Sequence, residues 1–473
     1  MGISQEKINK HSASPLNAGK INNADATGLG GSAKGQNLVK LSAKLNKEII
    51  KDIKFIAYGS PYCIAVADYL ASAVKGRSIY YSATVDRNYI EKYFGKFTPI
   101  EEYLLYSPLI ALHNLISNYV SKIEKPIHSL EENTVAVSMS GGIDSSVTAK
   151  IIKESGYNPI GLTFKVMEDS SSLKDISHAK MVCSKLGIPH FAINLVSQFK
   201  EEIINKFYLE YLKGRTPNPC VDCNKLIKFG VLLEKAKLLG ANFIASGHYC
   251  RKEKHNSSYI LKKGIDSTKD QSYMLWRLTQ LQLKHALFPL GGYHKKDIKI
   301  IGKKAFPFLK DRPESQDVCF IKDKNYHELI KDENNVGKGK ILNTKGEVIG
   351  KHKGYPFYTI GQRKGLGISH TKPLYVKEIH PDKNVIIAAE KEELYQKIVK
   401  VSQLNFITGA PPSKKFKAVV KIRYNSEPAE AYIKAWGNEG IIEFNRPQLS
   451  VTPGQSAVFY HSDTLLGGGI IIK

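Results

Sequence analysis

The sequence has few acidic residues for its length and no apolar stretch that would cross a membrane. Of its 473 residues, 44 are Asp or Glu and 69 are Lys or Arg, which gives a formal net charge of +25. A bilayer span needs about 18 to 20 apolar residues, and no run approaches that length. A charge this positive suits a polyanionic partner, first nucleic acid and second an anionic membrane surface. A lysine-rich solvated surface is the plainer alternative.

Cysteine is scarce, and the beginning of the chain has no apolar core. Six cysteines in a chain of this length make no disulfide framework. They indicate a reducing compartment, where a Cys-x-x-Cys pair binds a metal or a cluster or does redox chemistry. The first residues, MGISQEKINKHSASP, are unlike a secretory signal, and the absence of arginine before Arg77 is unlike a typical organelle transit peptide. We therefore expect a cytoplasmic protein with no membrane partner.

Residues 1–45 contain no aromatic residue and are rich in Gly, Ala, Asn, Ser and Lys. Such a segment buries too little apolar surface to offset its ordering entropy, so the composition predicts a disordered tail. The pattern then changes, because residues 49–59 are typical of a strand and residues 63–76 and 100–123 of helices. Residues 46–127 are therefore predicted to form a small α+β domain.

Strands and helices alternate over the next part of the chain. VAVSM and IGLTFKV are apolar strand patterns, SVTAKIIKES between them is a helical one, and the alternation continues to FIASGHY. Short joins between such elements indicate an α/β domain with a doubly wound parallel sheet, over residues 128–330. Short strands and Gly turns then predict two small β domains or barrels, at residues 331–398 and 399–473.

A glycine loop follows the first of these strands and opens a helix. Gly141 and Gly142 permit a tight turn, so backbone N–H groups and a helix N-terminus can converge on an anion. The loop lacks the Walker and dinucleotide glycine patterns. An ordinary Gly-rich turn is the alternative to a phosphate cradle. The motif SGGIDS resembles the signature of the ATP pyrophosphatase (PP-loop) superfamily, whose members cleave ATP between its α and β phosphates.

Two cysteines stand in TPNPCVDCNK, directly before a helical pattern. A thiol that begins a helix has its thiolate stabilised by backbone amides, and Lys225 and Lys228 add positive charge. Cys319 lies in the same α/β block and can converge on the same cleft as Cys220 and Cys223. Half of a zinc knuckle is the alternative, although no second Cys or His pair accompanies it. Three further cysteines are predicted to be packing residues: Cys63, Cys183 and Cys250.

Taken together, several motifs in one order resemble the tRNA-specific 2-thiouridylases of the MnmA type, over about residues 134–473. They are SMSGGIDSSV, GRTPNPCVDCNKLIKF, ASGHY, KDQSYML, GQRKGLGI, KIRY and VTPGQSAVFY with LGGGI. The resemblance implies a sulfurtransferase that uses ATP, with Mg²⁺, to adenylate O2 of the wobble uridine at position 34 of tRNA. Sulfur from a cysteine persulfide then replaces that oxygen and leaves AMP and pyrophosphate. The relay of sulfur starts at a cysteine desulfurase.

The resemblance also implies roles for individual residues. Cys223 would be the nucleophile and Cys319 the persulfide carrier, while Asn218, Pro219 and Cys220 would flank the target base. The ATP site would comprise Ser138, Met139, Ser140, Gly141, Gly142, Ile143, Asp144, Ser145, Phe164 and Gly247. Contacts to tRNA would come from His248, Lys269, Asp270, Gln271, Arg423, Tyr424 and Gln455. The plainer alternative for each polar residue is a solvated surface group, and for His248 a satisfied turn histidine.

One departure from the family leaves two mechanisms open. Many members have Asp where this chain has Cys220, and three thiolates (Cys220, Cys223 and Cys319) could hold a 4Fe-4S cluster that carries sulfide. We favour the persulfide relay, with no firm metal site. The other function classes are a different PP-loop synthetase, such as an amide-forming one, and a non-catalytic RNA-binding or sulfur-carrier protein. The intact SGGIDS loop argues against the last.

The front domain resembles iron–sulfur cluster scaffolds of the NifU/IscU type, through IKDIKFIAYGSPYCIAVADYLASAVKGRS. Its ligand pattern is degenerate. Ser60 and Tyr106 stand where ligand cysteines are expected, and Cys63 is three positions away. We therefore expect a docking module for the cysteine desulfurase or another sulfur-relay protein, since tethering raises the local donor concentration. A domain that only aids folding or dimerisation is the alternative.

Overall fold

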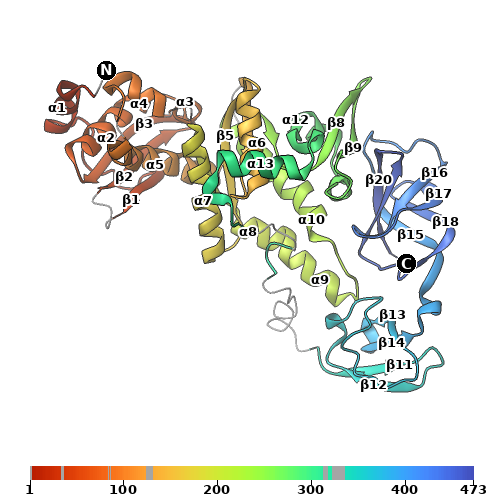
Figure 1. Ribbon diagram of the computed structural model, residues 1–473. Helices are drawn as coiled ribbons and strands as arrows, with labels where there is room; N and C mark the ends of the chain where they lie inside the picture. Colours follow the sequence, from red (N-terminus) through yellow and green to blue (C-terminus); the bar gives the residue numbers. More distant parts are fainter. Residues whose placement is uncertain are drawn as a thin grey trace.

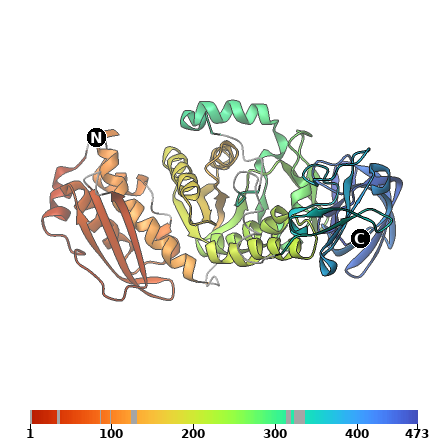
Figure 2. The same ribbon diagram turned by 90° about the horizontal axis from the view of Figure 1, so that it is seen from below.

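The computed structural model describes residues 3–32, 37–83, 85, 87–97, 99–123, 131–312, 318–321 and 336–472. The chain forms an N-terminal α+β unit, an α/β unit, a small β unit and a β-barrel (Figure 1). The N-terminal unit and the barrel lie at opposite ends, with the α/β unit between them (Figure 2). No helix in these ranges is both long and apolar enough to cross a bilayer.

The N-terminal unit is a three-stranded antiparallel sheet with helices on one face. Its strands are β1 (Ala26–Ser32), β2 (Asn37–Asn46) and β3 (Ile49–Tyr58). Its helices are α1 (Gln5–Ala13), α2 (Pro61–Val74), α3 (Ile79–Ala83), α4 (Arg87–Phe94) and α5 (Pro99–Lys122). Helix α5 lies directly on β1 because two strand residues have no side chain. A Cβ atom at Gly28 would stand 2.0 Å from the carbonyl oxygen of Ala111, and one at Gly30 would stand 1.9 Å from that of Ser107.

The prediction of a disordered tail at residues 1–45 is wrong for the described part of that segment. Helix α1, strand β1 and most of β2 lie within it, and Ile8, Val39 and Leu41 are fully buried. The surface that covers them comes from α2 and α5, which lie later in the sequence. The composition of residues 1–45 alone gives no sign of these later helices. Absence of aromatic residues is therefore compatible with order here, because small residues let the helices approach.

The α/β unit is built on a five-stranded sheet in the order β10-β7-β4-β5-β6, with every pair parallel. The strands are β4 (Glu131–Ser138), β5 (Asn158–Lys165), β6 (His190–Asn194), β7 (Ala241–Ala245) and β10 (Ala286–Leu287). This confirms the predicted doubly wound α/β class. The strand order reverses between β4 and β7, and ligands of open α/β sheets bind at such a switch point, beyond the carboxyl ends of the strands.

Helices surround this sheet, and one long helical run carries the Cys-x-x-Cys pair. That run consists of α10 (Pro219–Asp222), the π-helix Cys223–Val231 and α11 (Leu232–Leu238), which follow without a break. The other α-helices of this unit are α6 (Ile143–Glu154), α7 (Ser170–Leu186), α8 (Val196–Phe199), α9 (Lys206–Leu212), α12 (Gln280–His285) and α13 (Lys295–Ala305). A π-helix at Lys200–Asn205 lies between α8 and α9.

Two β units follow, and the second is a closed barrel. The first is a four-stranded sheet of β11 (Gly339–Leu342), β12 (Val348–His352), β13 (Tyr375–His380) and β14 (Val385–Ala389). The barrel closes through pairing of β15 with β20 and comprises β15 (Tyr395–Phe406), β16 (Lys415–Lys421), β17 (Ala429–Trp436), β18 (Glu439–Leu449), β19 (Ser456–His461) and β20 (Thr464–Ile471). A hairpin of the α/β unit, β8 (Cys250–His255) and β9 (Ser258–Lys263), extends the barrel sheet through β20.

The N-terminal unit is joined to the α/β unit through a shared core. Helix α5 packs against β6, and the ring centroids of His113 and Phe191 lie 5.1 Å apart. Lys235 of α11 is 5% exposed, and its ammonium donates to the carbonyl of Val120 at 2.9 Å and to that of Ile123. These carbonyls end α5, where the helix dipole is negative, so the buried charge caps the helix. The joint is therefore rigid rather than a flexible tether.

Replacing Lys235 with Met should loosen this joint. The substitution removes the charge that satisfies the carboxyl end of α5, and hydrogen bonds to charged groups contribute about 1.5–3 kcal/mol each. We expect a melting temperature several degrees lower and faster proteolysis between the two units. Lys206→Met is the matched control, since Lys206 forms an exposed ion pair with Glu202 that stabilises by only about 0–1 kcal/mol. Equal effects of the two variants would contradict the assignment.

Candidate active site

The SGGIDS loop lies at the carboxyl end of β4, at the switch point of the sheet. Gly141 adopts a left-handed φ of +67°, a conformation that favours glycine. A Cβ atom there would stand 2.5 Å from the carbonyl oxygen of Asp175. Gly142 is the N-cap of α6 and makes no side-chain cap. The Ser145 hydroxyl accepts from the amide of Ser140 at 3.2 Å and donates to the carbonyl of Gly142 at 3.1 Å. The loop is thus rigid, and the first amides of α6 face its opening.

Asp144 is held from two other elements. Its carboxylate accepts from the ammonium of Lys295 at 2.6 and 2.7 Å and from the hydroxyl of Tyr249 at 2.9 Å. Gly247, which follows β7, approaches the same turn, and a Cβ atom on it would lie 3.2 Å from the backbone carbon of Asp144. Phe164 ends β5 on the other side of β4 and is partly buried. The predicted ATP residues therefore converge on one edge of the sheet, as the motif order predicted; their individual contacts to ATP remain predictions.

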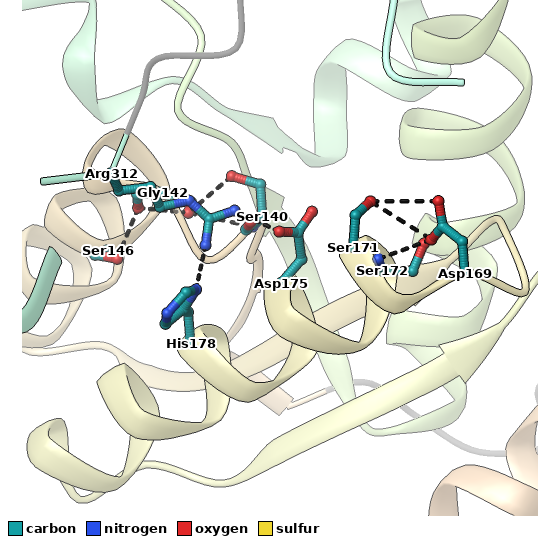
Figure 3. A network of polar contacts seen from close by, with 10 residues as sticks. Ser140, Gly142, Ser146, Asp169, Ser171, Ser172, Asp175, His178 and Arg312 are labelled. Carbon is teal, nitrogen blue, oxygen red and sulfur yellow. Dashed lines mark hydrogen bonds and ion pairs between the residues drawn. The ribbon is translucent and has the colours of Figure 1, made fainter. Parts of the chain in front are cut away.

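A guanidinium group lies over this loop (Figure 3). Arg312 donates to the carbonyl of Ser140 at 3.2 Å, to the carboxylate of Asp175 and to Nδ1 of His178. Asp175 and His178 stand three residues apart on α7, so both face the loop. The nearest guanidinium nitrogen is 3.2 Å from where a Cβ atom of Gly141 would stand. The mouth of the loop therefore carries a cation, which is paired with the carboxylate of Asp175.

The cysteine pair starts the long helical run. Asn218 is the N-cap of α10, and its side chain accepts from the amide of Cys220 at 3.2 Å. Cys223 is buried at the first position of the π-helix. Hydrogen bonds from i to i+5 place Lys228 about one turn after Cys223.

Cys319 belongs to a short described segment, residues 318–321. The neighbouring Phe320 anchors that segment, since its ring packs edge-on against Phe199 and Phe207 at 5.7 and 5.3 Å. The Cys319 side chain itself reaches solvent. Thiol charges on Cys220 and Cys319 would repel one on Cys223, which indicates that the three cysteines lie near one another; their roles remain predictions.

The electrostatic prediction for the thiols is wrong in sign. Burial raises the pKa of Cys223 to about 12. Cys319 reaches solvent on one side only, and desolvation by the surrounding protein together with the neighbouring Cys220 raises its pKa to about 11. Burial also raises the pKa of Cys220. Cys223 is inside a continuous helix rather than at its free end, so few unpaired amides face it. Lys228 opposes the shift at all three thiols, whereas Lys225 lies near Arg277 and Asp222.

The residues predicted to contact tRNA lie mainly where the α/β unit meets the barrel. The Tyr424 hydroxyl donates to the carbonyl of Asp270 at 3.0 Å, and the Gln455 amide donates to the carbonyl of Thr216 at 2.8 Å. The Gln271 side chain accepts from the amide of Tyr249 at 3.1 Å. Tyr424 and Gln455 therefore help to hold the junction, and Gln455 supports the loop that leads to Asn218. Arg423 also bonds within the chain, to the carbonyls of Leu449 and Ser450, while Lys269 precedes Asp270.

His248 and the remaining cysteines are internal. His248 is 8% exposed, its Nδ1 lies 2.8 Å from the Ser246 hydroxyl, and burial lowers its pKa well below the usual value. This favours the satisfied turn histidine, next to Gly247. The three predicted packing cysteines are fully buried: Cys63, Cys183 and Cys250. In the N-terminal unit Ser60 caps α2 and accepts from the amide of Cys63 at 3.3 Å, while the side chain of Tyr106 lies outside the described residues.

Sequence reasoning missed Arg312, Lys295 and Tyr249. Lys295 and Tyr249 stand more than 100 positions from Asp144, the residue that they hold, and nothing in local spacing marks them. Arg312 stands near the Cys319 motif, and only this proximity gave a signal. Within the described ranges, no group of three or more His, Cys, Asp or Glu side chains is placed to hold a metal ion.

A parallel sheet with a phosphate-cradling loop at its switch point, followed by two β units, defines an ATP-using enzyme of the PP-loop class. Family models match along the chain: NifU-like N terminal domain at residues 3–126, tRNA methyl transferase HUP domain at 133–323, tRNA methyl transferase PRC-barrel domain at 327–390 and Aminomethyltransferase beta-barrel domain at 396–471. The chain belongs to the tRNA-specific 2-thiouridylase (MnmA) family of sulfurtransferases.

Two relatives show the extent of the match. The tRNA-specific 2-thiouridylase MnmA 1 of Caldanaerobacter subterraneus subsp. tengcongensis is 49% identical over 357 residues, which cover 72% of this chain and 98% of that protein. The tRNA-specific 2-thiouridylase MnmA of Clostridioides difficile is 41% identical over 353 residues, with 72% and 98% covered. Each relative is thus matched almost over its full length.

Solved structures resemble separate parts of the chain. A putative iron–sulfur cluster assembly scaffold protein from Fervidobacterium islandicum is 18% identical, with 24% of this chain and 96% of that chain covered and a TM-score of 0.20. The U34-tRNA thiolase NcsA from Methanococcus maripaludis, solved with its [4Fe-4S] cluster, is also 18% identical, with 40% and 61% covered and a TM-score of 0.27.

Lys228→Met should make the thiols less reactive. Without the positive charge that lowers all three pKa values, the thiolate fraction at any pH below 11 falls. The alkylation rate of Cys319 should drop about 3- to 10-fold at pH 8, for a pKa increase of about half a unit to one unit. The readout is the pH profile of iodoacetamide labelling, resolved by peptide mass spectrometry. Lys225→Met is the control and should leave the profile in place. An unchanged profile in Lys228→Met would refute the role of Lys228.

Proposed function

We propose that this chain adenylates O2 of the wobble uridine of tRNA and then replaces that oxygen with sulfur carried by Cys319. The observation that carries the proposal is the phosphate loop at the switch point of a parallel sheet, in a chain of the 2-thiouridylase family. Asp175, at the mouth of that loop, and Lys228, on the helix of the cysteine pair, both influence the pKa of Cys319. This supports a single reaction centre that contains the phosphate loop and the thiols.

The chemistry divides into an activation and a transfer. The uridine O2 attacks the α phosphorus of ATP, the bond to the bridging oxygen breaks, and pyrophosphate leaves with the electron pair. The terminal sulfur of a Cys319 persulfide then attacks C2, and AMP departs with the former O2. The Cys223 thiolate attacks Sγ of Cys319 and breaks the S–S bond, so the sulfur stays on the base and a Cys223–Cys319 disulfide forms. A dithiol reductant restores both thiols.

Raised resting pKa values suit this order of events. A neutral Cys223 does not consume the persulfide before the base is activated. Lys228 then supplies the positive charge that favours the thiolate when Cys223 attacks. The thiols lie in a partly buried cleft. The wobble base must therefore leave the anticodon stack, so that its C2 atom comes within reach of the persulfide. The net charge of +25 suits the polyanionic substrate.

The residues of the site suit Mg²⁺ better than they suit a 4Fe-4S cluster. Mg²⁺ usually binds through substrate phosphates and one or two carboxylates, and Asp144 is the carboxylate of the loop, so Mg²⁺ would accompany ATP there. A 4Fe-4S cluster fits less well, because Cys220, Cys223 and Cys319 do not form a metal-binding group within the described ranges. We therefore favour the persulfide relay over the cluster.

The N-terminal unit supplies a surface for the sulfur donor. Its helices cover one face of the sheet, and on the other face Leu29, Lys40 and Ile56 are paired in one row across the three strands. Ile56 is 52% exposed and Tyr58, two residues on, is 73% exposed. Exposed apolar residues on an uncovered sheet suit protein docking. We place the cysteine desulfurase or another persulfide carrier here, held rigidly through Lys235.

The test combines ATP, unmodified tRNA and a sulfur donor, followed by nucleoside and nucleotide analysis. Wild-type protein should yield 2-thiouridine and AMP in equal amounts, and Cys223→Ser or Cys319→Ser should lower the yield at least about 100-fold. Cys220→Ser separates the mechanisms, since the relay predicts substantial activity without iron and the cluster predicts none. Tyr58→Asp should lower transfer from a desulfurase and leave sulfide-driven thiolation intact. Thiouridine formation without ATP would refute the proposal.

A further inference from the structure

We propose that Arg312 is a phosphate-binding residue of this site, which grips the pyrophosphate part of ATP and stabilises it as it leaves. The inference rests on the proposed function and assigns a role to a residue outside the SGGIDS motif. Its basis is the position of the guanidinium over the loop, among Ser140, Asp175 and His178 (Figure 3).

The position of Arg312 is the first argument. Its side chain is 18% exposed and lies against Gly141, the first of the two glycines of the loop. The amides at the start of α6 and the guanidinium therefore approach the same space from two sides. A guanidinium has five N–H donors in a rigid fork that matches phosphate oxygens in pairs. The three hydrogen bonds to Ser140, Asp175 and His178 use three of them.

The partners of Arg312 hold it in place and leave its charge available. Nδ1 of His178 accepts from the guanidinium of Arg312. Asp175 supplies one carboxylate, whose side chain is 45% exposed. A triphosphate carries more negative charge than one half-exposed carboxylate, so it competes effectively for the guanidinium. Asp175 therefore orients Arg312 toward the loop until the phosphates of ATP replace it as the partner of the guanidinium.

A cation at this position would assist the adenylation step. When O2 of uridine attacks the α phosphorus, negative charge develops on the oxygen that bridges to the β phosphorus. A fixed cation near that oxygen stabilises the transition state more than the bound substrate. Lys295 is not available for this role, since it is paired with Asp144 on the other side of the loop. Arg312 lies over the mouth of the loop instead (Figure 3).

Direct binding of ATP and of inorganic pyrophosphate tests the inference, measured by calorimetry on the full-length chain. Arg312→Gln should weaken both affinities at least about 10-fold, and Arg312→Lys should recover part of the loss, because charge returns without the fork. Asp175→Asn should bind pyrophosphate as tightly as wild type or more tightly. Lys174→Gln, an exposed neighbour on α7, removes the same charge away from the loop and should change neither affinity.

The outcomes separate a ligand role from a structural one. If Arg312 only clamps α7 to the loop, Arg312→Gln and Asp175→Asn will lower the melting temperature equally and leave both affinities unchanged, and the inference is overturned. If wild-type protein binds no ATP, the proposed function itself fails. Wild-type binding together with unchanged affinity in Arg312→Gln rejects the role of Arg312 alone.

Discussion

The left-handed turn at Gly141 is the constraint on which the rest of the site depends. It turns the chain at the switch point of the sheet, with no room for a side chain between the loop and the backbone of Asp175. That close approach brings α7 and Arg312 against the loop, while Gly247 allows the end of β7 to meet it from the other side. Any Cβ atom at Gly141 would force these elements apart and open the phosphate cradle.

Burial governs the chemistry of the thiols in the same way. A helix that runs through the Cys-x-x-Cys pair without a break places Cys223 in the core, where a thiolate is costly. One lysine on the π-helix offsets part of this cost for the three cysteines together. A buried, neutral Cys223 suits the proposed relay, which must not discharge before the base is adenylated.

Sequence reasoning predicted the architecture correctly and failed where partners are distant. The α/β alternation and the SGGIDS loop were both visible as local patterns. The order within residues 1–45 was not, because Ile8 and Leu41 are covered by helices far along the chain. Lys295 and Arg312 were invisible for the same reason. The sign of the thiol pKa shifts depends on burial, which a short motif does not encode.

In the proposed reaction the phosphate loop and the thiols form one reaction centre, in which Cys223 releases sulfur from Cys319. A single turnover of persulfide-loaded protein with ATP and tRNA, without reductant, is the decisive experiment. Peptide mass spectrometry should find one Cys223–Cys319 disulfide for each 2-thiouridine and each AMP. Stoichiometric 2-thiouridine with both cysteines still present as free thiols would contradict the account.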